Sequence, residues 1–167
     1  LLLWQCGAER YTMFKGVQDL ESGTPVSRDT IFRIYSMTKP VASVALMMLW
    51  DKGHFDLDDP IARFLPNFNE MTLYCPDGNH VRATCKIKIR HILNHTAGFI
   101  LPAFSEHPLR ELYVSDGVNG SRSEGTLTEV IDRLANKPLL FEPGTRWEYS
   151  MATDVVGRLI EVIDGRP

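Results

Sequence analysis

The stretch Ser36-Met-Thr-Lys-Pro-Val-Ala-Ser-Val-Ala-Leu-Met-Met-Leu-Trp-Asp-Lys52 decides how this chain folds. It predicts a helix with apolar side chains on nearly every side. Pro40 falls in the first turn, where a missing N–H does little harm, and Gly53 follows as the stop. A helix of this kind must be covered all round, so we expect it to lie in the middle of a domain.

Around this helix the sequence predicts a hairpin and several short helices. Apolar runs at residues 1–6 and 11–18 flank the turn residues 7–10, which indicates two paired strands. Helices are expected after Leu57 as far as Pro66, over 89–94, from a capping box at Thr126 to about 136, and over 152–163 with Gly165 as the stop. Two strands form only a marginal sheet, so either loops cover the central helix or further strands lie outside this chain.

Composition excludes several classes of function. The 167 residues are 44% hydrophobic with a net charge of −3, which favours one ordinary globular domain and gives no general attraction to nucleic acid or anionic lipid. The most basic stretch, Lys86 to Arg90, alternates charged and apolar residues and is best interpreted as the solvated face of a short strand. No apolar run reaches the roughly 20 residues of a membrane-spanning helix.

The three cysteines, Cys6, Cys75 and Cys85, lack the spacing of a metal site. Cys75 and Cys85 could face each other across a hairpin and form a disulfide, although unpaired thiols are the preferred interpretation. The first residue is leucine, so we expect the chain to begin inside a larger protein. Compartment and oligomeric state stay open.

Ser36 and Lys39 place a hydroxyl and an amine three residues apart at the start of the predicted helix. Positions i and i+3 share a face of a helix, so the amine can reach the serine oxygen. A serine hydroxyl is a weak nucleophile until a base takes its proton, and burial favours the neutral amine that can act as this base. Alone, the pair is a weak signal, because a serine that caps the helix and a lysine that lies along its surface give the same spacing.

Four further motifs accompany this pair in a fixed order. They are Asp29-Thr-Ile-Phe-Arg-Ile-Tyr35, Lys52-Gly-His-Phe-Asp-Leu-Asp-Asp-Pro60, Ile89-Arg-His-Ile-Leu-Asn-His-Thr-Ala-Gly98 and Glu142-Pro-Gly-Thr-Arg-Trp-Glu-Tyr-Ser150. The ordered set resembles the serine β-lactamase-related family, which includes class C β-lactamases, D,D-peptidases, and family VIII-type esterases and transesterases. The resemblance covers essentially the whole chain and is specific for the family rather than for one substrate.

The resemblance implies an α/β (α+β) fold of the β-lactamase/penicillin-binding type, in which an antiparallel sheet packs on helices. Residues 1–167 would form a partial serine hydrolase domain, with the N-terminal hairpin and the helical region present. The family's third motif, a Lys/His-x-Gly strand edge, is expected after Pro167 together with the remaining strands. That edge supplies one oxyanion-hole N–H and Ser36 the other. Losing one such donor lowers kcat by roughly 10²–10³, so we expect this chain alone to turn over poorly.

Three catalytic residues follow from the resemblance. Ser36 matches the acylated serine and Lys39 matches its lysine. Tyr149 matches the tyrosine that acts as general base and later as proton donor to the leaving group. A tyrosine so close to Trp147 is alternatively a buried aromatic side chain. The implied substrate is a small-molecule ester, amide or lactam, and no metal or organic cofactor is implied.

Met151 and His95 bear on which member of the family this chain resembles. Met151 stands where the β-lactam-processing branches carry an asparagine, and a thioether is a weak acceptor with no donor. This favours an esterase or transesterase; the alternatives are a β-lactamase or D,D-peptidase, and a non-catalytic binding protein of the same fold.

His95 could complete a triad with Ser36 and Asp154, but the resemblance places it in a structural turn, and the helix dipole favours a histidine there without catalysis.

Overall fold

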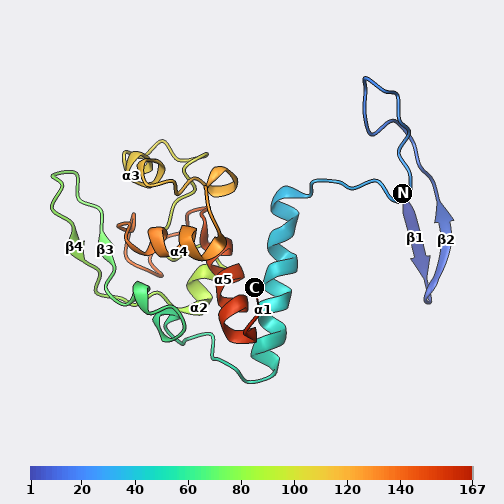
Figure 1. Cartoon of the computed structure of the whole chain (residues 1–167). Coiled ribbons are helices and arrows are strands. Elements are labelled where there is room, and N and C mark those ends of the chain that lie inside the picture. Colours follow the sequence, from blue (N-terminus) through green and yellow to red (C-terminus); the bar gives the residue numbers. More distant parts are fainter. Residues whose placement is uncertain (167) are drawn as a thin grey trace. The chain divides into compact units, whose positions relative to one another are not determined.

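Residues 1–36 form a unit built on one antiparallel hairpin in a computed structural model that describes residues 1–166 (Figure 1). Strands β1 (Leu2–Gln5) and β2 (Ala8–Thr12) pair with each other. Their turn is Cys6-Gly7, where φ is 52° and 73°, as a two-residue type I′ turn requires. The predicted hairpin is therefore present, but its second strand begins at Ala8 rather than at residue 11, because the turn is tighter than expected.

The predicted central helix belongs mainly to the second unit, Met37–Pro167. It consists of the 3₁₀ turn η1 (Tyr35–Met37) followed by α1 (Thr38–Asp51). Gly53 follows the helix with a φ of 76°, so the predicted glycine stop is correct. This left-handed residue reverses the chain toward the next segment.

Of the two alternatives given above, cover of α1 on every side by loops does not hold for the described residues. Leu46 and Leu49 are buried, whereas Val41, Val44 and Met48 keep 63%, 60% and 57% of their surface exposed. Among the described residues, only one stripe of the helix is therefore covered. The pattern of apolar residues was sufficient to predict the helix, but it did not reveal which face has a partner.

Helix α5 (Ala152–Asp164) is the main partner of α1, and the two run side by side (Figure 1). It also contacts α2 (Ile89–Leu93) and α4 (Leu127–Ala135). Val155, Val156 and Leu159 are fully or almost fully buried and form the apolar stripe that the sequence predicts. The core of the second unit is thus organised around α5.

Short elements complete the second unit. They are η2 (Ile61–Arg63), η3 (Pro66–Phe68), β3 (Thr72–Leu73), β4 (Val81–Arg82), α3 (Leu109–Ser115) and η4 (Gly120–Arg122). The helix predicted after Leu57 is only the 3₁₀ turn η2. Helix α3 was not predicted, although Leu109 and Tyr113 are buried one turn apart on its inner face. No helix within residues 1–166 is long and apolar enough to cross a membrane.

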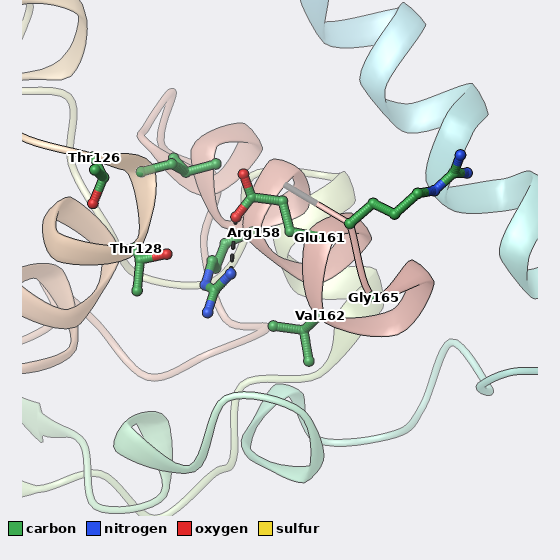
Figure 2. A pocket seen from close by; sticks show the side chains of 8 residues that line it. Thr126, Thr128, Arg158, Glu161, Val162 and Gly165 are labelled. Carbon is green, nitrogen blue, oxygen red and sulfur yellow. Dashed lines mark hydrogen bonds and ion pairs between the residues drawn. The ribbon is translucent and has the colours of Figure 1, made fainter.

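Helix α4 begins with the predicted capping box. The Thr126 hydroxyl accepts the N–H of Glu129 at 3.3 Å, and the Glu129 carboxylate accepts the N–H of Thr126 at 2.7 Å. A cavity of about 500 Å³ lies between this end of α4 and the last turns of α5, and Figure 2 shows the Arg158–Glu161 ion pair on its wall. None of the three predicted catalytic residues lines this cavity.

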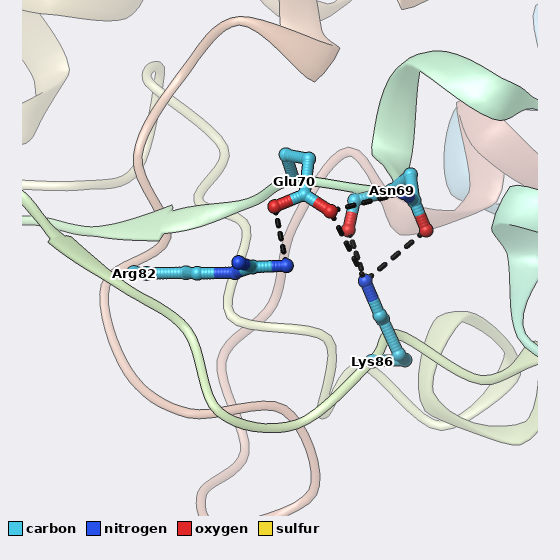
Figure 3. Close-up of polar contacts among 4 residues, drawn as sticks. All are labelled: Asn69, Glu70, Arg82 and Lys86. Atoms are coloured by element: carbon cyan, nitrogen blue, oxygen red, sulfur yellow. Dashed lines mark hydrogen bonds and ion pairs between the residues drawn. The ribbon is translucent and has the colours of Figure 1, made fainter.

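Strands β3 and β4 pair as a small antiparallel hairpin whose base is held by charged side chains. The Glu70 carboxylate lies 2.5 Å from a guanidinium nitrogen of Arg82 and 3.7 Å from the Lys86 Nζ. Figure 3 shows it between these two side chains. The stretch from Lys86 to Arg90 is not a strand, which corrects the sequence-based interpretation. Ile87 and Ile89 alternate with exposed or half-buried basic residues as expected, but Ile89 already begins α2.

Cys6, Cys75 and Cys85 are free thiols.

The capping box provides a test of the local fold. We expect Thr126→Ala to lower the free energy of unfolding by about 1 kcal/mol, because the N–H of Glu129 loses its acceptor. Thr128→Ala, two residues further into the same helix, is the matched control and should be neutral or slightly stabilising, since alanine is the better helix former. Urea unfolding of both variants measures the difference. Equal destabilisation of the two would contradict the capping role.

Candidate active site

Lys39 and Tyr149 come from distant parts of the sequence and meet in the second unit. Lys39 lies in the first turn of α1, and Tyr149 lies just before α5. The Lys39 Nζ is 4.8 Å from the centre of the Tyr149 ring, and both residues are half-buried. An ammonium over an aromatic face is attracted by about 0.5–2 kcal/mol. Two of the three predicted catalytic residues are therefore brought together.

Ser36 is the last residue of the first unit and lies in η1, directly before α1. It is exposed. Ser36 precedes Lys39 by three residues, which is the spacing expected if Ser36 is the nucleophile. The role of Ser36 as nucleophile stays a prediction.

The phenol ring of Tyr149 has two further ring neighbours. The His95 imidazole lies 5.0 Å away, centre to centre, and the Phe104 ring lies 6.3 Å away. Aromatic pairs at such distances stabilise each other beyond the area they bury. The ring is thus held by a cation, an imidazole and a benzyl group, which come from α1 and from two separate loops.

The backbone around Tyr149 is fixed by a second set of contacts, which we call the backbone frame. Four N–H groups of residues 140–151 donate to carbonyls of residues 95–100: Leu140 to Gly98 at 2.7 Å, Gly144 to Thr96 at 2.8 Å, Glu148 to His95 at 3.0 Å and Met151 to Ile100 at 3.3 Å. Both predicted motifs, His95 to Gly98 and Glu142 to Ser150, lie within this frame. The motifs are therefore neighbours in space as well as landmarks in the sequence.

Gly98 is the tightest point of the frame. Its φ is 92°, a conformation that L side chains rarely adopt, and a Cβ placed there would lie 2.5 Å from the carbonyl oxygen of Phe141. The glycine therefore lets two backbone segments approach more closely than any other residue would allow.

His95 contacts the residue after Tyr149 through its ring. Its Nδ1 accepts the backbone N–H of Ser150 at 3.3 Å and lies 3.2 Å from the Ser150 hydroxyl oxygen. A backbone N–H can only donate, so Nδ1 must carry its lone pair and the neutral ring holds its proton on Nε2. Burial lowers the pKa of His95, and the nearby charge of Lys39 lowers it further. These contacts join the imidazole to Ser150, and the structural role expected for His95 stays a prediction.

Asp154 adds a negative group to the same region. It lies in the first turn of α5 and is half-buried. Burial raises the pKa of its carboxyl, while the positive charge of Lys39 acts in the opposite direction. Asp154 is therefore close enough to Lys39 for the two charges to interact, and burial is the larger influence on its pKa.

Met151 is fully buried, and its N–H belongs to the backbone frame. The thioether places no hydrogen-bond donor beside Tyr149. Within residues 1–166, no group of three or more His, Cys, Asp or Glu side chains could hold a metal ion. The chemistry that this site offers is that of an amine, a phenol and a carboxylate.

Two contributors to the site were missed from the sequence. Phe104 lies in a loop outside the five motifs, and no periodicity marks it. The hydrogen bond from the Ser150 N–H to His95 was also missed. His95 has a φ of 60°, a conformation in which histidine is enriched. Both depend on loop geometry, which residue patterns do not encode.

Comparison with solved structures places the chain in a fold class. EstCE1, a hydrolase with promiscuous acyltransferase activity, superposes with a TM-score of 0.75 at 38% identity, over 96% of this chain and 40% of that protein. The chain is thus a mixed α/β protein of the β-lactamase and penicillin-binding type, as the sequence predicts.

Comparison with sequences then gives the family. A family model described as Beta-lactamase matches residues 1–167, so the chain belongs to the beta-lactamase family. Esterase EstB of Burkholderia gladioli is 36% identical over 159 residues, 94% of this chain and 38% of the esterase. Acyltransferase calJ of Penicillium decumbens is 32% identical over 173 residues, 99% of this chain and 40% of the acyltransferase. The chain therefore spans about two fifths of the length of these relatives.

The close approach at Gly98 makes the backbone frame testable. We expect Gly98→Ala to lower the melting temperature more than Gly53→Ala does, because a Cβ at 98 meets the Phe141 carbonyl while nothing lies within 4 Å at 53. Both glycines have positive φ, so the control carries the left-handed cost of roughly 1–2 kcal/mol without the clash. Thermal unfolding compares the two. Equal losses would show that the close approach adds nothing.

Proposed function

We propose that the whole protein that includes this chain is a serine hydrolase that forms an acyl-enzyme at Ser36 with an ester or amide substrate and passes the acyl group to water or an alcohol. The observation that carries this proposal is the contact between Lys39 and the Tyr149 ring at 4.8 Å. Membership of the beta-lactamase family and the likeness to an esterase and an acyltransferase support it.

In the proposed reaction, the Ser36 oxygen forms a bond to the carbonyl carbon of the substrate while its proton passes to Tyr149. The bond from this carbon to the leaving alkoxide or amine then breaks, and the leaving group takes the proton. Water or an alcohol next attacks the acyl carbon, and the bond to Ser36 breaks as the serine recovers a proton. Splitting the reaction into two such steps is the advantage of covalent catalysis.

Lys39 supplies the charge that this proton transfer needs. An ammonium beside a phenol favours the phenolate, which is the base that accepts the serine proton. Of the groups described above, Asp154 contributes a carboxylate and His95 a neutral ring. Lys39 therefore contributes the positive charge that acts on Tyr149.

Met151 favours an ester over a β-lactam substrate. The β-lactam-processing branches that the motifs resemble use an asparagine amide at this position to hold the lysine and the substrate. A fully buried thioether cannot donate a hydrogen bond to either. A β-lactamase or D,D-peptidase, and a binding protein of the same fold, are the alternatives.

The catalytic roles can be tested in the whole protein by hydrolysis of p-nitrophenyl butyrate. We expect Ser36→Ala to abolish turnover and labelling by a fluorophosphonate. Tyr149→Phe, which keeps the ring under the ammonium, should lower kcat by roughly 10²–10⁴ because the proton acceptor is lost. Tyr74→Phe and Lys52→Arg are controls outside the site and should match the parent. Hydrolysis that persists in Ser36→Ala would refute the nucleophile assignment.

The substrate class is tested by comparing p-nitrophenyl butyrate with nitrocefin on the parent protein. We expect a higher kcat/KM for the ester, since residue 151 offers no amide donor. A preference for nitrocefin would favour the β-lactamase alternative. Failure of the fluorophosphonate to label Ser36, with no turnover of either substrate, would favour the binding protein.

A further inference from the structure

His95 contacts the segment around Tyr149 through both its backbone and its ring. Its carbonyl accepts the N–H of Glu148 at 3.0 Å, and its Nδ1 accepts the N–H of Ser150 at 3.3 Å. Its ring lies 5.0 Å from that of Tyr149 and 6.3 Å from that of Trp147. One residue therefore contacts each of the four residues from Trp147 to Ser150.

These contacts hold the residues directly before and after Tyr149 in the sequence. The backbone is tied to His95 at the residue before Tyr149 and at the residue after it, and the phenol ring packs against the imidazole between the two. Fixing both neighbours of a residue and its ring leaves its side chain little freedom to leave the Lys39 ammonium. A displacement of about 1 Å in a reacting group can cost on the order of 10²-fold in rate.

We propose that His95 is a positioning residue for Tyr149, and that it acts through Nδ1 as a hydrogen-bond acceptor. The inference rests on the proposed function, because it assigns to Tyr149 the proton transfer from Ser36. It deepens that function by naming the group that holds the phenol in place. His95 itself exchanges no proton with the substrate.

The positioning contact depends on the protonation state of the imidazole. Protonation converts Nδ1 into a donor, which then opposes the N–H of Ser150. Protonation also places a second positive charge near Lys39 of α1. From the segment that contains Tyr149, the phenol of Tyr149 faces the His95 ring. The pKa of His95 is held below its ordinary value of 6.5 by burial and by Lys39, so the neutral, positioning form persists at neutral pH and is lost as the pH falls through the lowered value.

Two substitutions separate the acceptor from the ring. His95→Phe keeps an aromatic ring beside Tyr149 but removes the acceptor for the N–H of Ser150. His95→Asn removes the ring but offers an amide oxygen near the place of Nδ1, and asparagine tolerates the φ of 60° at this position. His54→Phe, beyond the other end of α1, is the matched control for the loss of a histidine.

The experiment measures kcat, KM and the pH profile of p-nitrophenyl butyrate hydrolysis in the whole protein, with fluorophosphonate labelling of Ser36. We expect His95→Phe to lower kcat by roughly 10- to 100-fold, with little change in KM and slower labelling at the same serine. His95→Asn should keep a kcat closer to the parent. It should also lack the fall in rate that we expect of the parent as the pH drops through the lowered pKa of His95. His54→Phe should match the parent throughout.

The outcomes distinguish this inference from the proposed function. If Ser36→Ala is inactive but His95→Phe keeps the parental kcat, or His95→Asn keeps the parental acid limb, the positioning role is overturned while the hydrolase stands. A larger loss in His95→Asn than in His95→Phe also overturns it, because ring packing would then matter and the acceptor would not. If His95→Phe fails to fold, the pH profile of His95→Asn decides. Activity that persists in Ser36→Ala overturns the proposed function itself.

Discussion

The backbone frame between residues 95–100 and 140–151 is the constraint on which the site depends. Four main-chain hydrogen bonds hold these segments together, and Tyr149 lies between two of the donors. Tyr149 itself belongs to no helix or strand, so regular secondary structure does not fix it. A loop residue reaches a defined position only when its backbone groups are satisfied by a rigid neighbour. Here that neighbour is the turn that follows α2.

The second requirement is the packing of α1 on α5, which brings an amine to this frame. Lys39 enters from the first turn of α1, and the half-buried Asp154 enters from the first turn of α5. The beginnings of the two helices thus contribute opposite charges to one place, and the aromatic ring of Tyr149 lies against the cation. A cation near a helix N-terminus is opposed by the helix dipole, so a carboxylate and an aromatic face are suitable partners for it.

Residue patterns were sufficient for the elements whose signals are local. The capping box at Thr126, the glycine stops at Gly53 and Gly165, and the apolar stripe of α5 all follow from spacing within one turn or one helix. The association of Lys39 with Tyr149 was expected only from the resemblance of the ordered motifs, because no local rule connects residues so far apart. The exposed face of α1 was left open between two alternatives, since a helix that is apolar all round does not indicate whether loops of this chain or further strands cover it.

The contacts of His95 and Phe104 were beyond prediction for a different reason. Each depends on the course of a loop, and loop geometry follows from hydrogen bonds between segments that the sequence places far apart. His95 was recognised as part of a turn, but its bond to Ser150 requires both loops to be in place. The acceptor role of Nδ1 is thus a property of the assembled fold.

The close approach at Gly98 has a consequence for how this family of sequences can change. Every other genetically encoded amino acid carries a Cβ, so each single-nucleotide change that replaces this glycine introduces the same collision with Phe141. Mutational drift therefore has no neutral step at position 98. The crossing point of the two segments therefore requires glycine at position 98, since any Cβ there meets the Phe141 carbonyl.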